Sequence, residues 1–154
     1  MSADGSLLYV AALAAGLVGG GQFFVLFAIV PPKRQWADSL RIPFHQQVLS
    51  ITADRLLRPI LGVAFVTGIA AIAVHHDVDG VSGVAMIIGP AACVGVMFMS
   101  FRFSFRLNEQ ISHLDPASEG QYEPIGRRWD VAHTLRTTCG MLAFVTYLLA
   151  SATL

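Results

Sequence analysis

Charged side chains are scarce in this sequence, and they carry no net charge. Asp, Glu, Lys and Arg make up 13% of the 154 residues, against about 25% in an ordinary soluble domain. The ten basic residues balance the ten acidic ones. This balance argues against nucleic acid as a partner, because binding phosphates requires a basic face. Hydrophobic residues make up 55% of the chain, so the positions of the few charges decide what kind of protein it is.

Four stretches lack acidic and basic side chains altogether: residues 7–30, 59–74, 81–101 and 137–154. A helix rises about 1.5 Å per residue, so about 20 residues cross the hydrocarbon core of a bilayer. The second and fourth stretches are shorter, but arginines at their ends can extend to the headgroups from inside a helix. The pattern predicts an all-α, four-transmembrane-helix bundle in one domain, 1–154, with helices near 6–30, 43–75, 81–108 and 128–153.

Basic residues are absent before the first stretch, between the second and third, and after the fourth. All ten lie around the first and third connections: Lys33, Arg34, Arg41, Arg55, Arg58, Arg102, Arg106, Arg127, Arg128 and Arg136. The positive-inside rule puts these connections in the cytoplasm. We therefore expect an integral protein of a bacterial inner (plasma) membrane, N-out/C-out, whose long second helix begins at Pro43 and projects into the cytoplasm.

Cysteines and recognisable catalytic motifs are also few. Cys93 and Cys139 are expected at different depths of their helices, too far apart for a disulfide. The sequence contains no Gly-rich phosphate loop, HExxH or GxSxG motif. The histidines at 75 and 76 are adjacent and do not aim readily at one ion, so a metal site there is not favoured. No cofactor is predicted.

Helix one is rich in small residues. Ala12, Gly16 and Gly20 are spaced four apart, a pattern that lets another helix approach closely. Gln22, the strongly polar residue of that span, either bonds a neighbouring helix or faces a cavity. Pro31 and Pro32 are expected to end the helix.

The start of helix four carries the most reactive set of side chains. Trp129, His133, Arg136 and Gly140 share one face by three- and four-residue spacing. His133 is expected to point inward, because ionisable groups at membrane depth avoid lipid, and a histidine can transfer protons near neutral pH. The alternative is structural: a tryptophan anchored among headgroups, an arginine extending to them, and a histidine hydrogen-bonded between helices.

Other polar residues are expected near the same depth. Asp54 and Arg58 are four residues apart and suited to an ion pair. Asn108 ends the third predicted helix. His45 is expected at the membrane interface rather than in a site.

The chain resembles the anthrone oxygenase-like family of small four-helix membrane proteins. The resemblance rests on Val30-Pro31-Pro32 after a Gly/Ala-rich helix, on LNEQI at 107–111, and above all on WDVAHTLRT at 129–137. Characterised members of that family oxidise an anthrone to an anthraquinone with O₂ and without a dedicated redox cofactor. The resemblance implies a site of Asn108, Trp129, His133 and Arg136, with Asp54 and Arg58 as further candidates.

These observations predict a membrane-embedded oxidoreductase or oxygenase that acts on a hydrophobic aromatic or quinol-type molecule. His133, Arg136 and Asn108 would be catalytic, and Trp129, Asp54, Arg58 and Gln22 would bind substrate. Two alternatives stay open: a non-enzymatic accessory or structural membrane subunit, and a haem or metal protein using His133 with another histidine. The expected partners are a hydrophobic small molecule, the lipid bilayer, and a second copy or another membrane protein.

Overall fold

The computed structural model describes residues 3–75, 80–117 and 119–153, except the side chains of residue 4 and residues 51–54. Within these ranges the regular structure is helical, in four long segments that match the four expected. The segments are α1 (Ala3–Phe24), η1 (Val25–Ile29) and α2 (Val30–Lys33); α3 (Asp38–Phe44), η2 (His45–Ala53) and α4 (Asp54–Val74); α5 (Gly80–Met99), η3 (Ser100–Ser104) and α6 (Phe105–Ser112); and α7 (Tyr122–Thr153).

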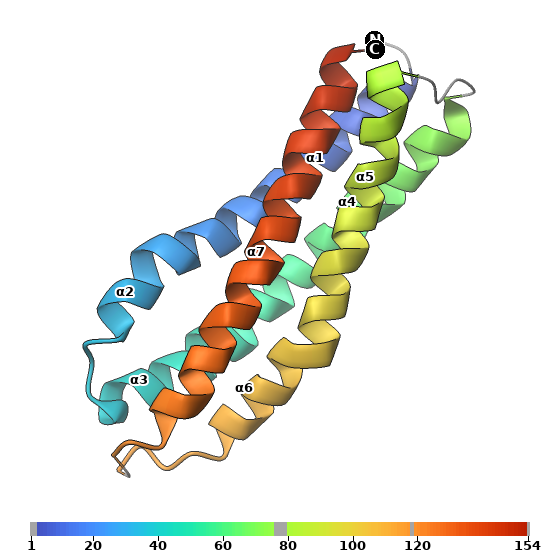
Figure 1. Ribbon diagram of the computed structural model, residues 1–154. Coiled ribbons are helices and arrows are strands. Elements are labelled where there is room, and N and C mark those ends of the chain that lie inside the picture. Colours follow the sequence, from blue (N-terminus) through green and yellow to red (C-terminus); the bar gives the residue numbers. More distant parts are fainter. Residues whose placement is uncertain (1–2, 76–79, 118, 154) are drawn as a thin grey trace.

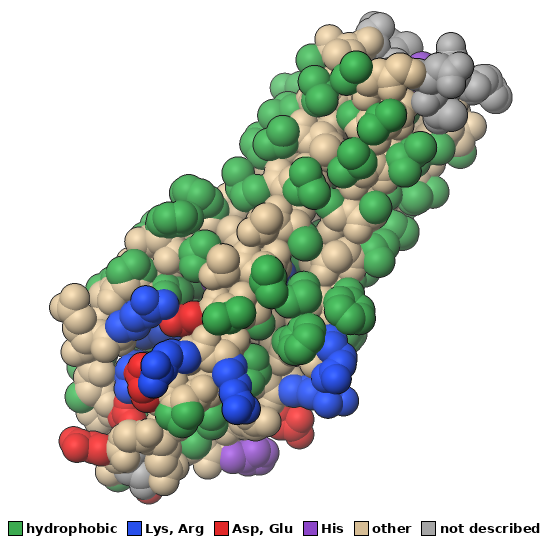
Figure 2. All heavy atoms as spheres, viewed as in Figure 1, with side chains coloured by type: hydrophobic (Ala, Val, Ile, Leu, Met, Phe, Trp, Pro, Cys, Tyr) green, Lys and Arg blue, Asp and Glu red, His purple; other side chains and the backbone are tan. Residues whose placement is uncertain are grey.

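All four segments are long and apolar enough to cross a membrane, which indicates an integral membrane protein. Large apolar side chains face outward along them, such as Leu17 and Val66, each 63% exposed. In water such a surface would be costly, whereas lipid contacts it without penalty. Figure 2 shows apolar side chains spread along most of the length of the bundle.

The helices form a closed ring in which α7 packs against α1 and α5, and α4 packs against the same two helices. The beginning of α1 and the end of α7 lie at one end of the bundle, as Figure 1 shows. The loop residues 34–37, 113–117 and 119–121 lie at the opposite end, here called the basic end. Cys93 and Cys139 are both free thiols, as expected.

Small residues bring α1 close to α7, but not with the predicted spacing. A Cβ added to Gly19 would lie 3.0 Å from the backbone of Gly140 on α7, whereas one added to Gly20 would meet nothing within 4 Å. Gly20 is exposed. A spacing of four drifts around a helix of 3.6 residues per turn, so the buried stripe passes from Ala12 through Ala15 to Gly19.

Three of the four segments contain π-helical turns near the basic end. The N–H of Val30 bonds the carbonyl of Val25, and that of Phe105 bonds the carbonyl of Ser100; both bonds span five residues. The Ser100 hydroxyl donates a hydrogen bond to the Val96 carbonyl at 2.8 Å, in the turn that precedes η3. Such turns are rare in proteins and occur frequently at functional sites.

Several helices are longer than predicted. The first continues through Pro31 and Pro32 to Lys33, because the prolines occupy the first turn of α2, where their missing N–H groups are not needed. The second begins at Asp38 rather than Pro43. The third runs on to Ser112.

The fourth begins at Tyr122 rather than near Arg128. Pro124 falls in its first turn, where a proline is tolerated. Gly126 has no side chain, so the Tyr122 ring can lie directly over it.

Candidate functional site

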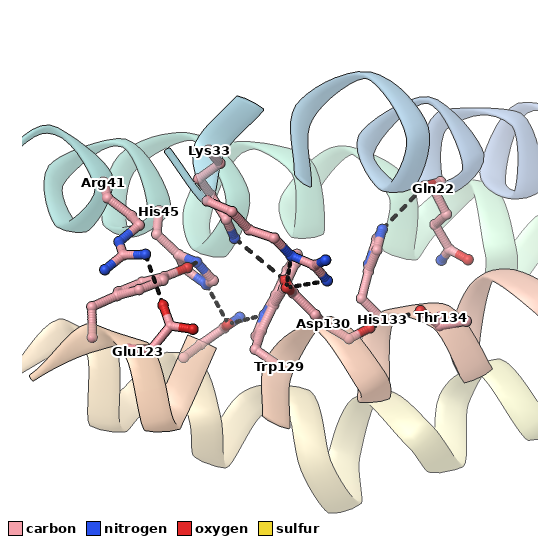
Figure 3. Close-up of polar contacts among 12 residues, drawn as sticks. Gln22, Lys33, Arg41, His45, Glu123, Trp129, Asp130, His133 and Thr134 are labelled. Atoms are coloured by element: carbon pink, nitrogen blue, oxygen red, sulfur yellow. Dashed lines mark hydrogen bonds and ion pairs between the residues drawn. The ribbon is translucent and has the colours of Figure 1, made fainter. Parts of the chain in front are cut away.

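The basic end contains an unusual number of buried polar side chains, here called the polar core. They come from all four helical segments and are Gln22, Lys33, Asp38, Arg41, His45, Ser104, Asp130, His133, Arg136 and Thr137. Ionisable groups at membrane depth are rare, and they normally pair with one another or line a functional path. Figure 3 shows most of the ionisable members converging between α2, α3 and α7.

His133 is fixed in one protonation form by its two hydrogen bonds. Its Nε2 lies 3.0 Å from the backbone carbonyl of Gln22, and its Nδ1 lies 3.2 Å from Nη2 of Arg136. A guanidinium only donates and a carbonyl only accepts. His133 is therefore neutral, with the proton on Nε2 and a lone pair on Nδ1 directed at the arginine. Figure 3 shows its ring reaching from α7 towards α1.

Trp129 forms one wall beside this histidine. Its indole stacks on the His133 ring with centroids 4.7 Å apart and planes 7° from parallel. The Nζ of Lys33 lies over the indole, 4.6 Å from its centroid. The ring is 2% exposed, so its position is set by buried neighbours and not by lipid headgroups.

A small cavity adjoins His133. It is lined by Gln22, Val25, Leu49, Leu57, Trp129, His133 and Arg136, and its volume is about 10 Å³. A space of that size holds roughly one water molecule. The side-chain oxygen of Gln22 is buried and has no hydrogen-bond partner among the described residues. A buried acceptor without a donor is costly, and this oxygen lies beside Gly140, where an added Cβ would come within 3.1 Å of it.

A second histidine lies on the far side of Trp129. His45 is fully buried, which contradicts the expectation that it lies at the interface. The Trp129 indole donates to Oδ1 of Asn108 at 2.8 Å. This oxygen therefore also accepts from Nε2 of His45, at 3.3 Å. Nδ1 of His45 then accepts from the hydroxyl of Tyr122 at 2.7 Å, so both ring nitrogens of His45 have partners.

Ion pairs close the polar core on the side of the loops. Asp130 lies 3.6 Å from Nζ of Lys33 and 3.0 Å from Nη2 of Arg34. Arg41 bonds Asp38 through Nε at 2.9 Å and Glu123 through Nη1 at 3.0 Å. These pairs tie α2 and α3 to the start of α7 (Figure 3).

The predicted site residues fall into three groups. Trp129, His133, Arg136 and Gln22 lie together around the cavity, and all four are buried. Asn108 is half-buried and bonds Trp129 and His45, so it reaches the site through the indole. Arg58 is exposed and stacks on Phe105, with its guanidinium carbon 4.1 Å from the ring centroid. Asp54 begins α4, but its side chain lies outside the described residues.

The predicted site residues did not include Lys33, His45 or Asp130 of the polar core, nor Tyr122, which bonds His45. Asp130 belongs to the helix-four motif and shares a helical face with His133, but it was not counted among the site residues. His45 opens a π-helical segment, in which the 3.6-residue period used to assign faces does not hold. Lys33 is 1% exposed; no pattern distinguishes it from the basic residues that stay at the surface.

The described residues contain no group of three or more His, Cys, Asp and Glu side chains able to hold a metal ion. Residues 76–79 of the histidine-containing turn lie outside this description. Both ring nitrogens of His45 and of His133 are engaged by protein groups. Ligation of a haem iron by either ring would first have to break one of these bonds.

Comparison with known proteins assigns no family to this chain. No protein-family model, curated protein or solved structure matches it.

Proposed function

We infer that this protein is a membrane-embedded oxidoreductase that oxidises a lipid-soluble aromatic compound of the anthrone type with O₂ at the cavity beside His133. The observation that carries this inference is the neutral His133, whose Nδ1 lone pair faces the Arg136 guanidinium. A base and a fixed cation at one buried point suit proton abstraction next to a carbonyl group. The resemblance of residues 129–137 to the anthrone oxygenase-like family supports the same chemistry.

In the proposed reaction the aromatic substrate packs against Trp129 and its carbonyl oxygen accepts a hydrogen bond from Arg136. The guanidinium then turns from Nδ1 of His133 to the substrate oxygen. The freed Nδ1 takes a proton from the CH₂ group, and Arg136 stabilises the enolate oxygen. The electron-rich carbon reacts with O₂. The CH₂ becomes a carbonyl that keeps one oxygen atom, and the two hydrogens leave with the other oxygen as water.

Asn108 acts in this proposal as a positioning residue. Its Oδ1 accepts the indole N–H of Trp129 at 2.8 Å, which holds the ring plane parallel to His133. The sequence predicted a catalytic Asn108, and the proposal gives it this indirect role instead, because Trp129 lines the cavity and Asn108 does not.

A tricyclic compound does not fit a cavity of about 10 Å³, so the proposal requires the site to open. Leu49 of η2 and Leu57 of α4 form one wall of the cavity, and Val25 of η1 forms another. Both walls contain π-helical turns, whose hydrogen bonds are less regular than those of an α-helix. We propose that substrate passes from the bilayer between these two helices, displacing the leucine side chains.

The basic end faces the cytoplasm in this proposal, and both termini lie outside. The ten basic residues support the orientation, because none lies at the opposite end of the sequence-predicted bundle. The membrane is then the bacterial inner (plasma) membrane.

The test is oxygen consumption by purified protein given an anthrone in detergent or lipid. His133→Gln keeps a polar side chain but removes the base, and we expect the rate to fall by about 10²–10⁴-fold. His113→Gln is the matched control, because His113 is exposed in the loop after α6, and its rate should be unchanged. Wild-type turnover in a folded His133→Gln variant would overturn the mechanism.

A structural membrane subunit is the second candidate, and the ion pairs favour it. Asp130 and Glu123 pair with cations of neighbouring segments, and Asp38 pairs with Arg41 of its own helix, as expected if the polar core only fastens the bundle. This candidate predicts that His133→Gln leaves function unchanged and that the protein co-purifies with another membrane protein.

A further inference from the structure

A groove runs along the outside of the bundle at the basic end, between the third and fourth helical segments. Its volume is about 780 Å³, and its walls are the end of α5 with η3 and α6 on one side and the first turns of α7 on the other. Sites for small molecules commonly have volumes of about 300–1,000 Å³. The cavity beside His133 opens between other helices, so the groove is a separate feature.

The lining of the groove changes from charged to apolar along the bundle. On α7, Arg127 and Arg128 come first and are followed by Val131 and Leu135. At about 1.5 Å per residue, Leu135 lies about 10 Å deeper than Arg128. The opposite wall runs from Arg106, past Arg102 and Phe103, to Met99. The groove therefore has a cationic part towards the basic end and an apolar part towards the middle of the bundle.

The positive charge of this groove is largely uncompensated. Arg127 pairs with Glu123 at 3.3 Å. No carboxylate among the described residues forms an ion pair with Arg102, Arg106 or Arg128, and all three side chains are exposed. Lys33 and Arg41 of the polar core, by contrast, each pair with a carboxylate. Figure 2 shows blue side chains gathered at this end and apolar side chains beyond them.

Exposed aromatic side chains mark the depth of the groove in the membrane. Phe98 is 60% exposed and Phe101 is 67% exposed, on the same segment as Arg102. Phenylalanine is favoured inside the hydrocarbon region, whereas arginines near helix ends extend to the level of the lipid headgroups. The arginines therefore lie where phosphate groups lie, and the apolar floor lies where acyl chains begin.

We propose that this groove binds a glycerophospholipid with an anionic headgroup. The headgroup phosphate lies among Arg102, Arg106 and Arg128. One acyl chain runs over Phe103 and Val131 towards Leu135. A basic pocket between membrane helices is a recognised site for anionic lipid, and the charge of this groove matches such a headgroup better than the zwitterionic headgroup of phosphatidylcholine. The proposal holds whether or not the protein is an enzyme.

Native mass spectrometry of the detergent-purified protein, titrated with dioleoyl phosphatidylglycerol or dioleoyl phosphatidylcholine, tests the proposal. The wild-type protein should bind phosphatidylglycerol more tightly than phosphatidylcholine. Each arginine near a lipid surface contributes about fivefold in affinity, so Arg106→Gln with Arg128→Gln should weaken phosphatidylglycerol binding by about 30-fold. Binding of phosphatidylcholine should not change. The single variant Arg128→Gln should weaken phosphatidylglycerol binding about fivefold. It gives the same test if the double variant does not fold.

The matched control is Arg55→Gln with Arg58→Gln, which removes two exposed arginines outside the groove. Because salt screens charges that lie far from the bound lipid, this control should change the affinity for phosphatidylglycerol by less than about twofold. Equal affinity for the two lipids, or an equal loss in the control, would overturn the proposal. Millimolar inorganic phosphate should not displace the lipid, because the acyl chain contributes to binding; displacement would assign the groove to free phosphate instead.

Discussion

The ion pair between Lys33 and Asp130 gives a sharp test of the polar core, because its two partners are not equivalent. The Lys33 side chain is 2% exposed and that of Asp130 is 9% exposed. Asp130 also pairs with Arg34, whose side chain is 61% exposed. Removing the carboxylate therefore leaves a buried ammonium without a counter-charge, whereas removing the ammonium leaves a carboxylate that keeps a second cation.

The two substitutions should differ in cost. Breaking a buried pair costs about 3–5 kcal/mol, and Lys33 keeps its contact with the Trp129 ring at 4.6 Å. We expect Asp130→Asn to lower the free energy of unfolding by about 3 kcal/mol. Lys33→Met should lower it by only about 1 kcal/mol, because Arg34 still neutralises Asp130. The double variant should be more stable than Asp130→Asn alone, since it leaves no buried unpaired ammonium.

The measurement is unfolding of the purified protein by SDS in mixed micelles, followed by tryptophan fluorescence and circular dichroism. Three proteins are compared with wild type: the two single variants and the double variant. A cost for Lys33→Met equal to that for Asp130→Asn would refute the assignment of Arg34 as the second partner. A double variant whose cost is the sum of the single costs would show that the pair does not interact.

Two further substitutions test the packing with the same unfolding assay. An added methyl group at Gly68 would overlap the Tyr147 hydroxyl, whereas one at Gly20 would meet nothing within 4 Å. Gly68→Ala should therefore cost about 1–3 kcal/mol, and equal stability of this variant and Gly20→Ala would contradict the packing. Trp129→Phe removes the 2.8 Å bond to Asn108 and should cost about 1 kcal/mol; wild-type stability would mean that this bond contributes nothing.

The number and character of the helices could be predicted from the sequence because charge is excluded from lipid over four stretches, such as 81–101. That signal depends only on composition along the chain. The same pattern also predicts which residues lie near each end of the bundle, so both ends were identified from the sequence. Helix ends were less predictable, because Pro31 and Pro124 fall in first turns, where proline is compatible with a helix.

The helix-four face was predictable, because α7 is a regular α-helix and Trp129, His133 and Arg136 keep its period. The partners across the bundle were not predictable in the same way. His45 opens η2, where wider turns rotate later residues away from the positions expected at 3.6 residues per turn. The burial of Lys33 depends on Asp130, Trp129 and Tyr122 meeting it from α7, a tertiary arrangement that local sequence does not encode.

The central claim is that the His133 site transfers oxygen from O₂ to a lipid-soluble aromatic compound. The most direct measurement is mass spectrometry of the product formed from an anthrone under ¹⁸O₂ in ordinary water. The proposed reaction predicts one ¹⁸O atom in each product molecule, formed at a rate that depends on wild-type protein and is lost in His133→Gln. Product without ¹⁸O, or labelled product formed equally fast without the protein, would contradict the claim.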